Sequence, residues 1–217
     1  KMKTIHINEQ FKEDWNRVLN HIANLFYEDS VIQFTKDGAN MSISFDYEIA
    51  DDYTISTAAK LLVDGQEFTS SYSIGYKTEG TEKEQSIRMK RALSHVMLDV
   101  LEQYTGMTQQ WGILTGVRPT KLYHKFRKEG LSEEQIFEKL KTDFRLSDLK
   151  INLLKEIVAR QLHVIPDLDE LGREISIYIG VPFCPTMCAY CTFPAYAIQS
   201  NRKAGRVEKF IDGLHIE

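Results

Sequence analysis

The sequence contains few cysteines and prolines and no long hydrophobic run, and each scarcity excludes a class of protein. With 3 Cys and 5 Pro among 217 residues, neither a disulfide scaffold nor a proline-rich disordered chain is expected. No apolar segment approaches the roughly 20 residues of a membrane-spanning helix, and the first residues, Lys1–His6, lack the apolar core of a signal peptide. The sequence therefore predicts a globular cytoplasmic protein.

Excess positive charge is also missing. The chain has 27 Lys and Arg against 31 Asp and Glu, a formal net charge of -4, which argues against a general binder of nucleic-acid phosphates. Gly112 and Gly116 do not form a phosphate-binding loop, so nucleotide hydrolysis finds no support. With 42% hydrophobic and 27% charged residues, the composition is typical of a globular protein.

The three cysteines lie within eight residues, at Cys184, Cys188 and Cys191. An odd number of closely spaced thiols fits a metal or redox site better than disulfides. A structural zinc site needs four ligands, and the closest histidines in sequence are His163 and His215. An iron–sulfur cluster held by three thiolates would leave one iron open to another ligand. The alternatives are small buried side chains or an incomplete zinc site.

This spacing, C-x-x-x-C-x-x-C with Tyr190 before the third cysteine, resembles the signature of the radical S-adenosylmethionine (SAM) superfamily. The resemblance implies that Cys184, Cys188 and Cys191 bind three irons of a [4Fe-4S] cluster, and that SAM chelates the fourth through its amino and carboxylate groups. Reduction of the cluster would then cleave SAM into methionine and a deoxyadenosyl radical. Tyr190 would lie near the adenine of the cofactor.

The residues around the motif, Ile177–Cys184 and Cys188–Phe193, resemble the oxygen-independent coproporphyrinogen III oxidase (dehydrogenase) family of haem biosynthesis. In that family a tyrosine precedes the first cysteine by six residues, and Tyr178 occupies this position. The resemblance implies a catalytic and cofactor-binding role for Tyr178 and a cofactor-binding role for Phe193. A buried strand residue with a bonded hydroxyl is the alternative for Tyr178. A second block, Trp111–Leu122, resembles a longer branch of the family with a large N-terminal region.

The resemblance implies an oxidoreductase. Its reaction would be the oxidative decarboxylation of coproporphyrinogen III to protoporphyrinogen IX, with a porphyrinogen as ligand and a flavodoxin- or ferredoxin-type protein as electron donor. The chain departs from the family at Gly180, where a histidine is frequent, and at Phe193, where the best-known dehydrogenases have a further cysteine. Related haem chaperones share the Cys-x-Phe ending, so haem binding and transfer is the alternative function. A protein-interaction module without metal is a third.

The sequence divides into three predicted regions, 1–80, 81–170 and 171–217. The first is an α+β domain with an antiparallel sheet, because apolar residues alternate along several short segments after one amphipathic helix, Phe11–Phe26. An initial strand is expected at Thr4–Ile7. The predicted antiparallel meander consists of Ser30–Thr35, Met41–Ile49, Tyr53–Val63 and Gln66–Tyr76, with turns at Lys36–Ala39, Ala50–Asp52 and Asp64–Gly65.

The second region is a predicted helical connector. Thr81 and Glu84 indicate a capping box for a helix that ends near Tyr104, before Gly106. Further helices are expected from Pro119 to Lys128, after the capping box of Ser132 and Gln135, and from Asp148 to His163. The residues expected to face inward on the first helix are Met89, Leu93, Val96, Met97, Val100 and Leu101.

Basic residues recur on the helix that begins at Pro119. Their spacing of three, four and three residues predicts one basic face, opposite Leu122 and Phe126. This face is a candidate for binding tetrapyrrole carboxylates or an acidic electron donor, with a solvated helix face as the alternative. Its members are Arg118, Lys121, Lys125 and Lys128.

The third region is expected to begin an α/β radical SAM barrel of partial TIM type. A strand at Glu174–Val181 would lead into the cysteine loop, which suits a fold whose reactive groups follow the C-terminal ends of strands. A first barrel helix would present Val207, Phe210, Ile211 and Leu214. Lys1 ahead of Met2, and a helix without a stop signal at Glu217, suggest a piece of a longer protein, inactive by itself.

Overall fold

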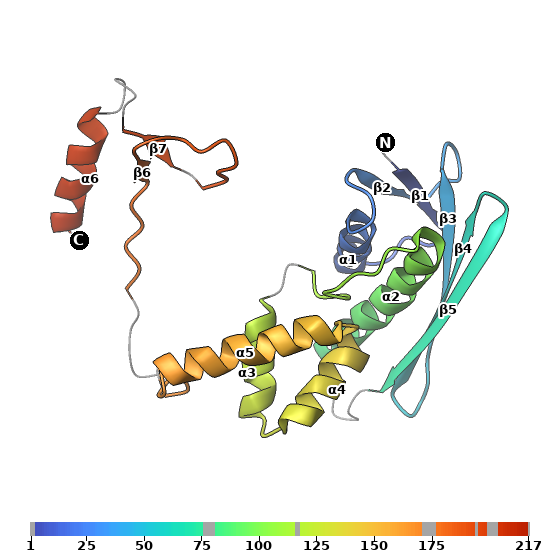
Figure 1. Cartoon of the computed structure of the whole chain (residues 1–217). Coiled ribbons are helices and arrows are strands. Elements are labelled where there is room, and N and C mark those ends of the chain that lie inside the picture. Colours follow the sequence, from blue (N-terminus) through green and yellow to red (C-terminus); the bar gives the residue numbers. More distant parts are fainter. Residues whose placement is uncertain are drawn as a thin grey trace. The chain divides into compact units, whose positions relative to one another are not determined.

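The computed structural model describes residues 3–75, 81–115, 118–170, 177–193, 195–198 and 204–216. The chain forms two compact units, Lys1–Pro166 and Asp167–Glu217, and each is described by itself (Figure 1). Among the described helices, none is long and apolar enough to cross a membrane.

The first unit is built on a five-stranded mixed sheet. Its strand order is β2-β1-β3-β4-β5. Strand β1 pairs in parallel with both of its neighbours, β2 and β3, whereas β3, β4 and β5 pair antiparallel. The strands are β1 (Lys3–Ile7), β2 (Ser30–Gln33), β3 (Met41–Ile49), β4 (Thr54–Val63) and β5 (Gln66–Gly75).

The antiparallel meander predicted from the sequence is confirmed for β3 to β5 and is wrong for β2. Helix α1 (Glu13–Asn24) joins β1 to β2, and a helical crossover lets the second strand run parallel to the first. Residue alternation indicates a strand but does not identify its partner. The sheet is therefore mixed, and the unit is an α+β fold.

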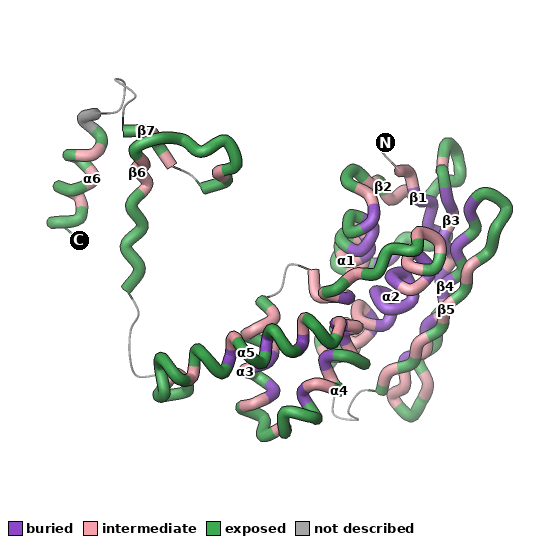
Figure 2. The backbone as a smooth tube through the Cα atoms, in the orientation of Figure 1, coloured by how far each residue is buried: buried purple, intermediate pink, exposed green. Residues whose placement is uncertain are grey.

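Two helices cover one face of the sheet. Helices α1 and α2 (Glu82–Thr105) lie on the same side, and Figure 2 shows the buried residues between them and the strands. Every residue predicted to face inward on α2 is buried. Thr81 caps the helix by accepting the Glu84 amide at 3.4 Å, which is one of the two bonds of the predicted capping box. Gly106 ends the helix in the left-handed conformation, as predicted.

Three further helices form a second core. They are α3 (Pro119–Lys128), α4 (Glu133–Phe144) and α5 (Asp148–Val164). The ends of α3 and α5 and the start of α4 agree with the predictions to within a residue. The capping box of Ser132 and Gln135 is present in both directions. This core contains Tyr123, Phe126, Ile136, Leu140, Phe144, Leu146, Ile151, Leu154 and Val158.

Gly112 connects the two cores at close range. Its φ of +52° lies in the left-handed region, and a Cβ atom at this position would stand 2.1 Å from the Phe144 carbonyl oxygen. The next amide, Ile113, donates to that same oxygen at 3.0 Å, and its side chain packs against both cores. Only glycine fits here without moving backbone.

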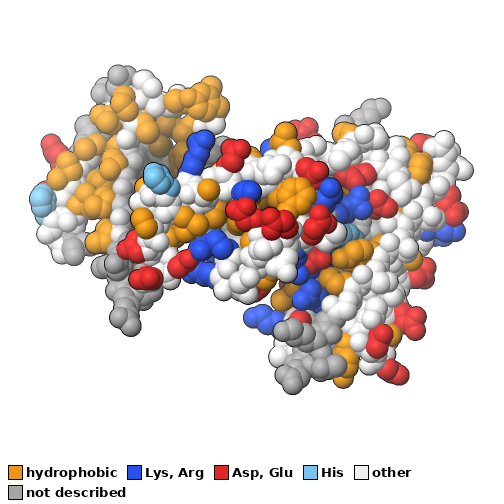
Figure 3. All heavy atoms as spheres, turned by 60° about the horizontal axis from the view of Figure 1, so that its bottom comes forward, with side chains coloured by type: hydrophobic (Ala, Val, Ile, Leu, Met, Phe, Trp, Pro, Cys, Tyr) orange, Lys and Arg blue, Asp and Glu red, His pale blue; other side chains and the backbone are white. Residues whose placement is uncertain are grey.

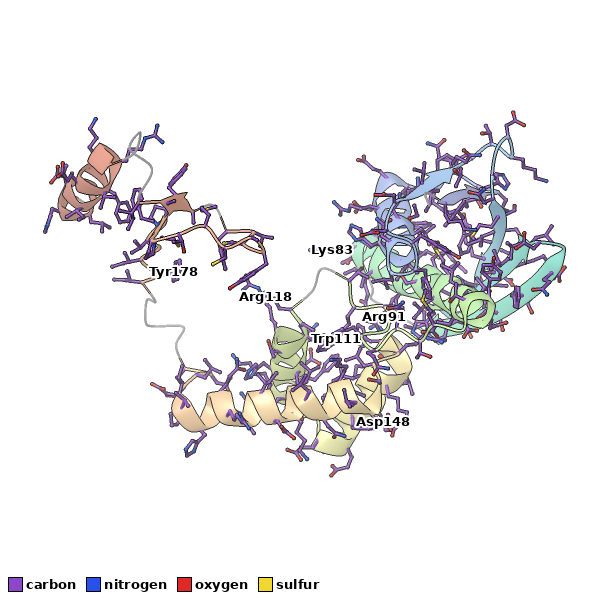
Figure 4. The ribbon with its side chains drawn as sticks, turned by 45° about the horizontal axis from the view of Figure 1, so that its top comes forward. Lys83, Arg91, Trp111, Arg118, Asp148 and Tyr178 are labelled. Carbon is purple, nitrogen blue, oxygen red and sulfur yellow. The ribbon has the colours of Figure 1, made fainter. Side chains whose placement is uncertain are left out.

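Ion pairs join α2 to the end of α4. Arg91 of α2 reaches Asp143 at 3.3 Å and lies over the Phe144 ring at 4.2 Å (Figure 4). Arg145, in the left-handed conformation just after α4, meets Asp99 at 3.0 Å and Glu102 at 2.7 Å. These partly buried pairs hold the helical part against the sheet part.

His95 lies buried at the same junction. Its ring stacks on Tyr72 with 3.8 Å between centroids, and its Nε2 is 2.8 Å from the Asp143 carbonyl oxygen. Burial lowers the pKa of His95 to about 4, and the neighbouring Arg145 and Arg91 act in the same direction, against the bond to Asp143. The side chain is therefore neutral at pH 7.

The second unit contains a short parallel pair and one helix. Strands β6 (Phe183–Cys184) and β7 (Tyr196–Ala197) pair in parallel, and α6 (Ala204–Ile216) matches the helix predicted there. Of the predicted strand 174–181, residues 174–176 lie outside the described residues. Residues 177–181 form no strand, because the described chain offers them no pairing partner. The start of a barrel stays a prediction.

Candidate functional site

The three cysteines lie on one loop that is closed at its base. Cys184 ends β6, and the chain returns 12 residues later as β7. The Tyr196 amide donates to the Pro182 carbonyl at 2.8 Å, and the Ile198 amide donates to the Cys184 carbonyl at 2.9 Å. A turn inside the loop brings the Cys191 amide to the Cys188 carbonyl at 3.0 Å. The backbone thus ties the positions around all three cysteines.

Three aromatic rings support the base of the loop. Phe183, next to the first cysteine, meets Phe210 of α6 edge to face at 5.7 Å and Tyr196 of β7 at 6.1 Å between centroids. Such ring pairs each contribute roughly 0.5–1.5 kcal/mol beyond their buried area. This cluster was not predicted from the sequence, although the aromatic residues on both sides of the loop were a signal for it.

The thiols differ in exposure. Cys184 and Cys191 are partly buried, Cys188 is exposed, and none of them forms a disulfide. In the described part of the chain, no three His, Cys, Asp or Glu side chains come close enough to hold a metal ion. The structure therefore places the predicted ligands on one loop without gathering their sulfur atoms around one point.

The other predicted site residues are exposed. Tyr178 is 92% exposed, Tyr190 87% and Phe193 79%, so the structure brings none of these rings into a buried site. The alternative prediction of a packed Tyr178 is wrong for this structure. A Cβ at Gly180 would lie 3.2 Å from the Tyr178 ring, so a larger residue at 180 would require the ring to move.

The donor set fits an iron–sulfur cluster by its chemistry. Thiolates are the ligands that such clusters use, and the three thiols here are unpaired and carried by a single loop. The loop has no fourth cysteine, and the chain contains no other. Three thiolates would leave one iron of a four-iron cluster for a ligand from outside the chain.

Comparison with known proteins supports the interpretation of this loop. The chain is 47% identical over 204 residues to the oxygen-independent coproporphyrinogen-III oxidase-like protein HemZ of Bacillus subtilis (strain 168). The match covers 93% of this chain, which leaves about 15 residues outside it, and all three cysteines lie farther than that from either end. The loop is therefore inside the matching segment.

The match covers much less of HemZ than of this chain, because the chain spans 40% of the length of HemZ. No protein-family model matches the chain. The resemblance inferred from the cysteine motif is nonetheless confirmed: over nearly all of its length this chain is similar to an oxygen-independent coproporphyrinogen-III oxidase-like protein.

Proposed function

We propose that the protein is a radical SAM oxidoreductase of haem biosynthesis, which converts coproporphyrinogen III to protoporphyrinogen IX by oxidative decarboxylation. The observation that carries the proposal is the set of three unpaired thiols with x3 and x2 spacing on one loop, inside a segment similar to HemZ. The oxidase-like name of that relative supports the reaction class. We propose that the protein carries out this reaction in the cytoplasm.

In this proposal Cys184, Cys188 and Cys191 hold a [4Fe-4S] cluster and leave one iron for the amino and carboxylate groups of SAM. When bound, the cluster and SAM supply the one-electron chemistry. The three cysteines would lose their thiol protons when they bind iron, and the rest of the chain would hold the loop in position. The backbone bonds at its base and the contact of Phe183 with Phe210 serve that purpose.

The test uses the whole protein, purified and reconstituted without oxygen. We expect the electron paramagnetic resonance spectrum of the reduced cluster to change on addition of SAM, and deoxyadenosine to form. Replacing Cys184, Cys188 or Cys191 by Ala should abolish both. Thr186→Ala, on the same exposed loop, is the matched control and should retain both. Deoxyadenosine from any of the cysteine variants would contradict the ligand roles.

A haem carrier on the same scaffold is the second candidate, and two residues favour it. Phe193 stands where the best-known dehydrogenases have a cysteine, and Gly180 stands where a histidine is frequent. Phe193 is 79% exposed, so a flat apolar ligand has access to its ring. Stoichiometric haem binding without any tetrapyrrole product would favour this candidate, whereas product formed from coproporphyrinogen III would exclude it as the main function.

A further inference from the structure

Helix α3 presents an exposed basic face to which the roles proposed above assign nothing. It consists of Arg118, Lys121, Lys125 and Lys128, all exposed, which we call the α3 basic face. At 1.5 Å per residue the cations extend over about 15 Å of helix. The sequence placed Leu122 opposite these cations, but Leu122 is half-buried and lines the same surface hollow, while Tyr123 and Phe126 face the core.

The charge at the start of this face is uncompensated by ion pairs in the described part of the chain. In the described part of the chain neither Arg118 nor Lys121 forms an ion pair, and the amine of Lys125 is 3.7 Å from a Glu129 carboxylate oxygen. Some lysines elsewhere in the unit lie closer to carboxylates, as in Lys141–Asp148 at 3.0 Å and Lys60–Glu67 at 3.0 Å. Figure 3 shows such mixing of acidic and basic side chains on one face of the molecule. The α3 basic face is an exception in a chain of net charge -4.

The stability of the helix does not account for the cations at its start. The N-terminus of a helix carries partial positive charge, and the first turns of α1, α2, α4 and α5 accordingly contain acidic residues. The first turn of α3 contains no acidic residue and has Lys121, with Arg118 at the cap position and no side-chain cap bond (Figure 4). Both cations oppose the helix dipole, so their placement needs another reason.

The hollow among these side chains indicates the size of a partner. Its volume is about 560 Å³, and the described residues that line it all come from α3 and the residues at its two ends. One helix cannot enclose a small molecule, whereas small-molecule sites usually bury 70–90% of their ligand. Leu122 and the long side chains of Arg118, Lys121, Lys125 and Lys128 are among the residues that line it, so it combines aliphatic surface with positive charge. Such a surface suits a larger partner with carboxylates spread over several ångströms.

We propose that the α3 basic face docks the acidic surface of a small electron-transfer protein. The identity of the partner as an electron donor rests on the proposed function, which requires one-electron reduction. The acidic character of the partner rests on the four cations and on the unpaired state of Arg118 and Lys121.

The test measures binding, without SAM or turnover. Flavodoxin, an acidic flavin protein, is titrated into the whole protein at about 50 mM and about 500 mM salt. Arg118→Glu with Lys121→Glu should raise the dissociation constant at least about tenfold at low salt, and high salt should reduce this difference. The reversal removes cations from the start of α3, so the dipole favours the variant helix and circular dichroism should show an unchanged fold.

The matched control reverses two exposed lysines elsewhere, Lys36→Glu with Lys83→Glu, and changes the net charge by the same amount. Its dissociation constant should stay within about twofold of the parent. Equal weakening by both double variants, or by neither, would overturn the proposal. So would binding of a single-stranded RNA that depends on Arg118 and Lys121 when flavodoxin does not bind.

The binding test and the SAM-cleavage test can fail independently of each other. If SAM cleavage depends on the cysteines but the Arg118 and Lys121 substitutions do not change flavodoxin binding, only the docking proposal is overturned. Flavodoxin binding that needs both residues, in a protein that does not cleave SAM, would support the acidic docking surface and overturn the proposed function.

Discussion

The two units use similar apolar residues in opposite ways. In Lys1–Pro166 the apolar faces of the sheet and helices are buried in two adjoining cores. In Asp167–Glu217 none of the described residues is buried, and Ile177, Ile179 and Val181 are more than 60% exposed. Hydrophobic side chains gather on the surface of this second unit (Figure 3).

The difference shows that apolar content does not by itself make a core. A side chain gains the free energy of burial when a second element covers it, at about 25 cal/mol per Å². The first unit has two helices for one sheet face. The second places one helix and three aromatic rings around a loop, so its candidate ligands depend on local backbone bonds. A large exposed apolar surface of this kind is typical of an interaction site.

The largest effect should come from the core of the first unit. Phe45 is 2% exposed and meets Phe11 edge to face at 5.7 Å. Phe45→Ala should lower the free energy of unfolding by about 3–5 kcal/mol, because it leaves a cavity. Urea unfolding followed by circular dichroism measures this. The exposed Tyr178, replaced by Ala in the second unit, should change it by less than about 0.5 kcal/mol. Similar losses of stability in both variants would contradict the difference in burial between the two units.

The junction between the two cores should be nearly as sensitive. Gly112→Ala should cost about 3 kcal/mol, since the residue has positive φ and the new methyl group would meet the Phe144 carbonyl. Gly106→Ala is the matched control: its φ is +70°, but no atom lies within 4 Å of the new Cβ, and about 1 kcal/mol is expected. Equal losses in the same urea titration would show that backbone conformation, not the close contact, sets the cost.

Acid should weaken the first unit through His95. Its pKa is near 4 in the folded state and about 6.5 when unfolded, so the unfolded chain binds the additional proton between these values. The contribution of neutral His95 to the free energy of unfolding is fully present above pH 6.5. It is lost as the pH falls toward 4, which lowers the free energy of unfolding by about 2–3 kcal/mol. His95→Gln retains a hydrogen-bonding side chain without that titration. The slope of stability against pH should be smaller in this variant, and an identical slope would exclude His95 as the cause.

The smallest effect on stability should come from the aromatic cluster of the second unit. Phe183→Ala removes the contacts with Tyr196 and Phe210 and should leave unfolding of the first unit unchanged. In the metal-free protein it should raise the labelling rate of Cys184 by a thiol reagent toward that of the exposed Cys188. Phe193→Ala, which removes an exposed ring from the same loop, should not. A Cys184 rate unaffected by Phe183→Ala would show that the cluster does not shield the loop.

Local signals in the sequence predicted much of the first unit. Ser132 with Gln135 predicted a capping box, and Asp64–Gly65 predicted a tight hairpin whose two residues have φ of 52° and 76°. Interactions between residues at most four positions apart determine these features, so a short stretch of sequence is enough to predict them. The pairing of β2 with β1 was not predictable in this way, because it joins residues 27 positions apart.

The candidate site also has features that the sequence predicted and features that only the structure showed. The spacing of Cys184, Cys188 and Cys191 is a property of the sequence, and it predicted three thiols on one loop. Together with the residues around it, it also predicted the resemblance to the oxygen-independent coproporphyrinogen III oxidase family. The ring contacts that hold the loop and the exposure of Tyr178 required the structure, since they depend on where α6 and β7 return.

The sequence by itself determined the helix caps, the hairpin turn and the spacing of the three candidate thiol ligands, because each depends on residues close together in the chain. The tertiary structure decided the mixed sheet order, the need for glycine at 112 and the neutral state of His95. It also showed the cations of α3 to be exposed and Arg118 and Lys121 to be without ion pairs in the described chain. These properties arise from segments that meet only after folding, and burial and charge are set by what each segment meets.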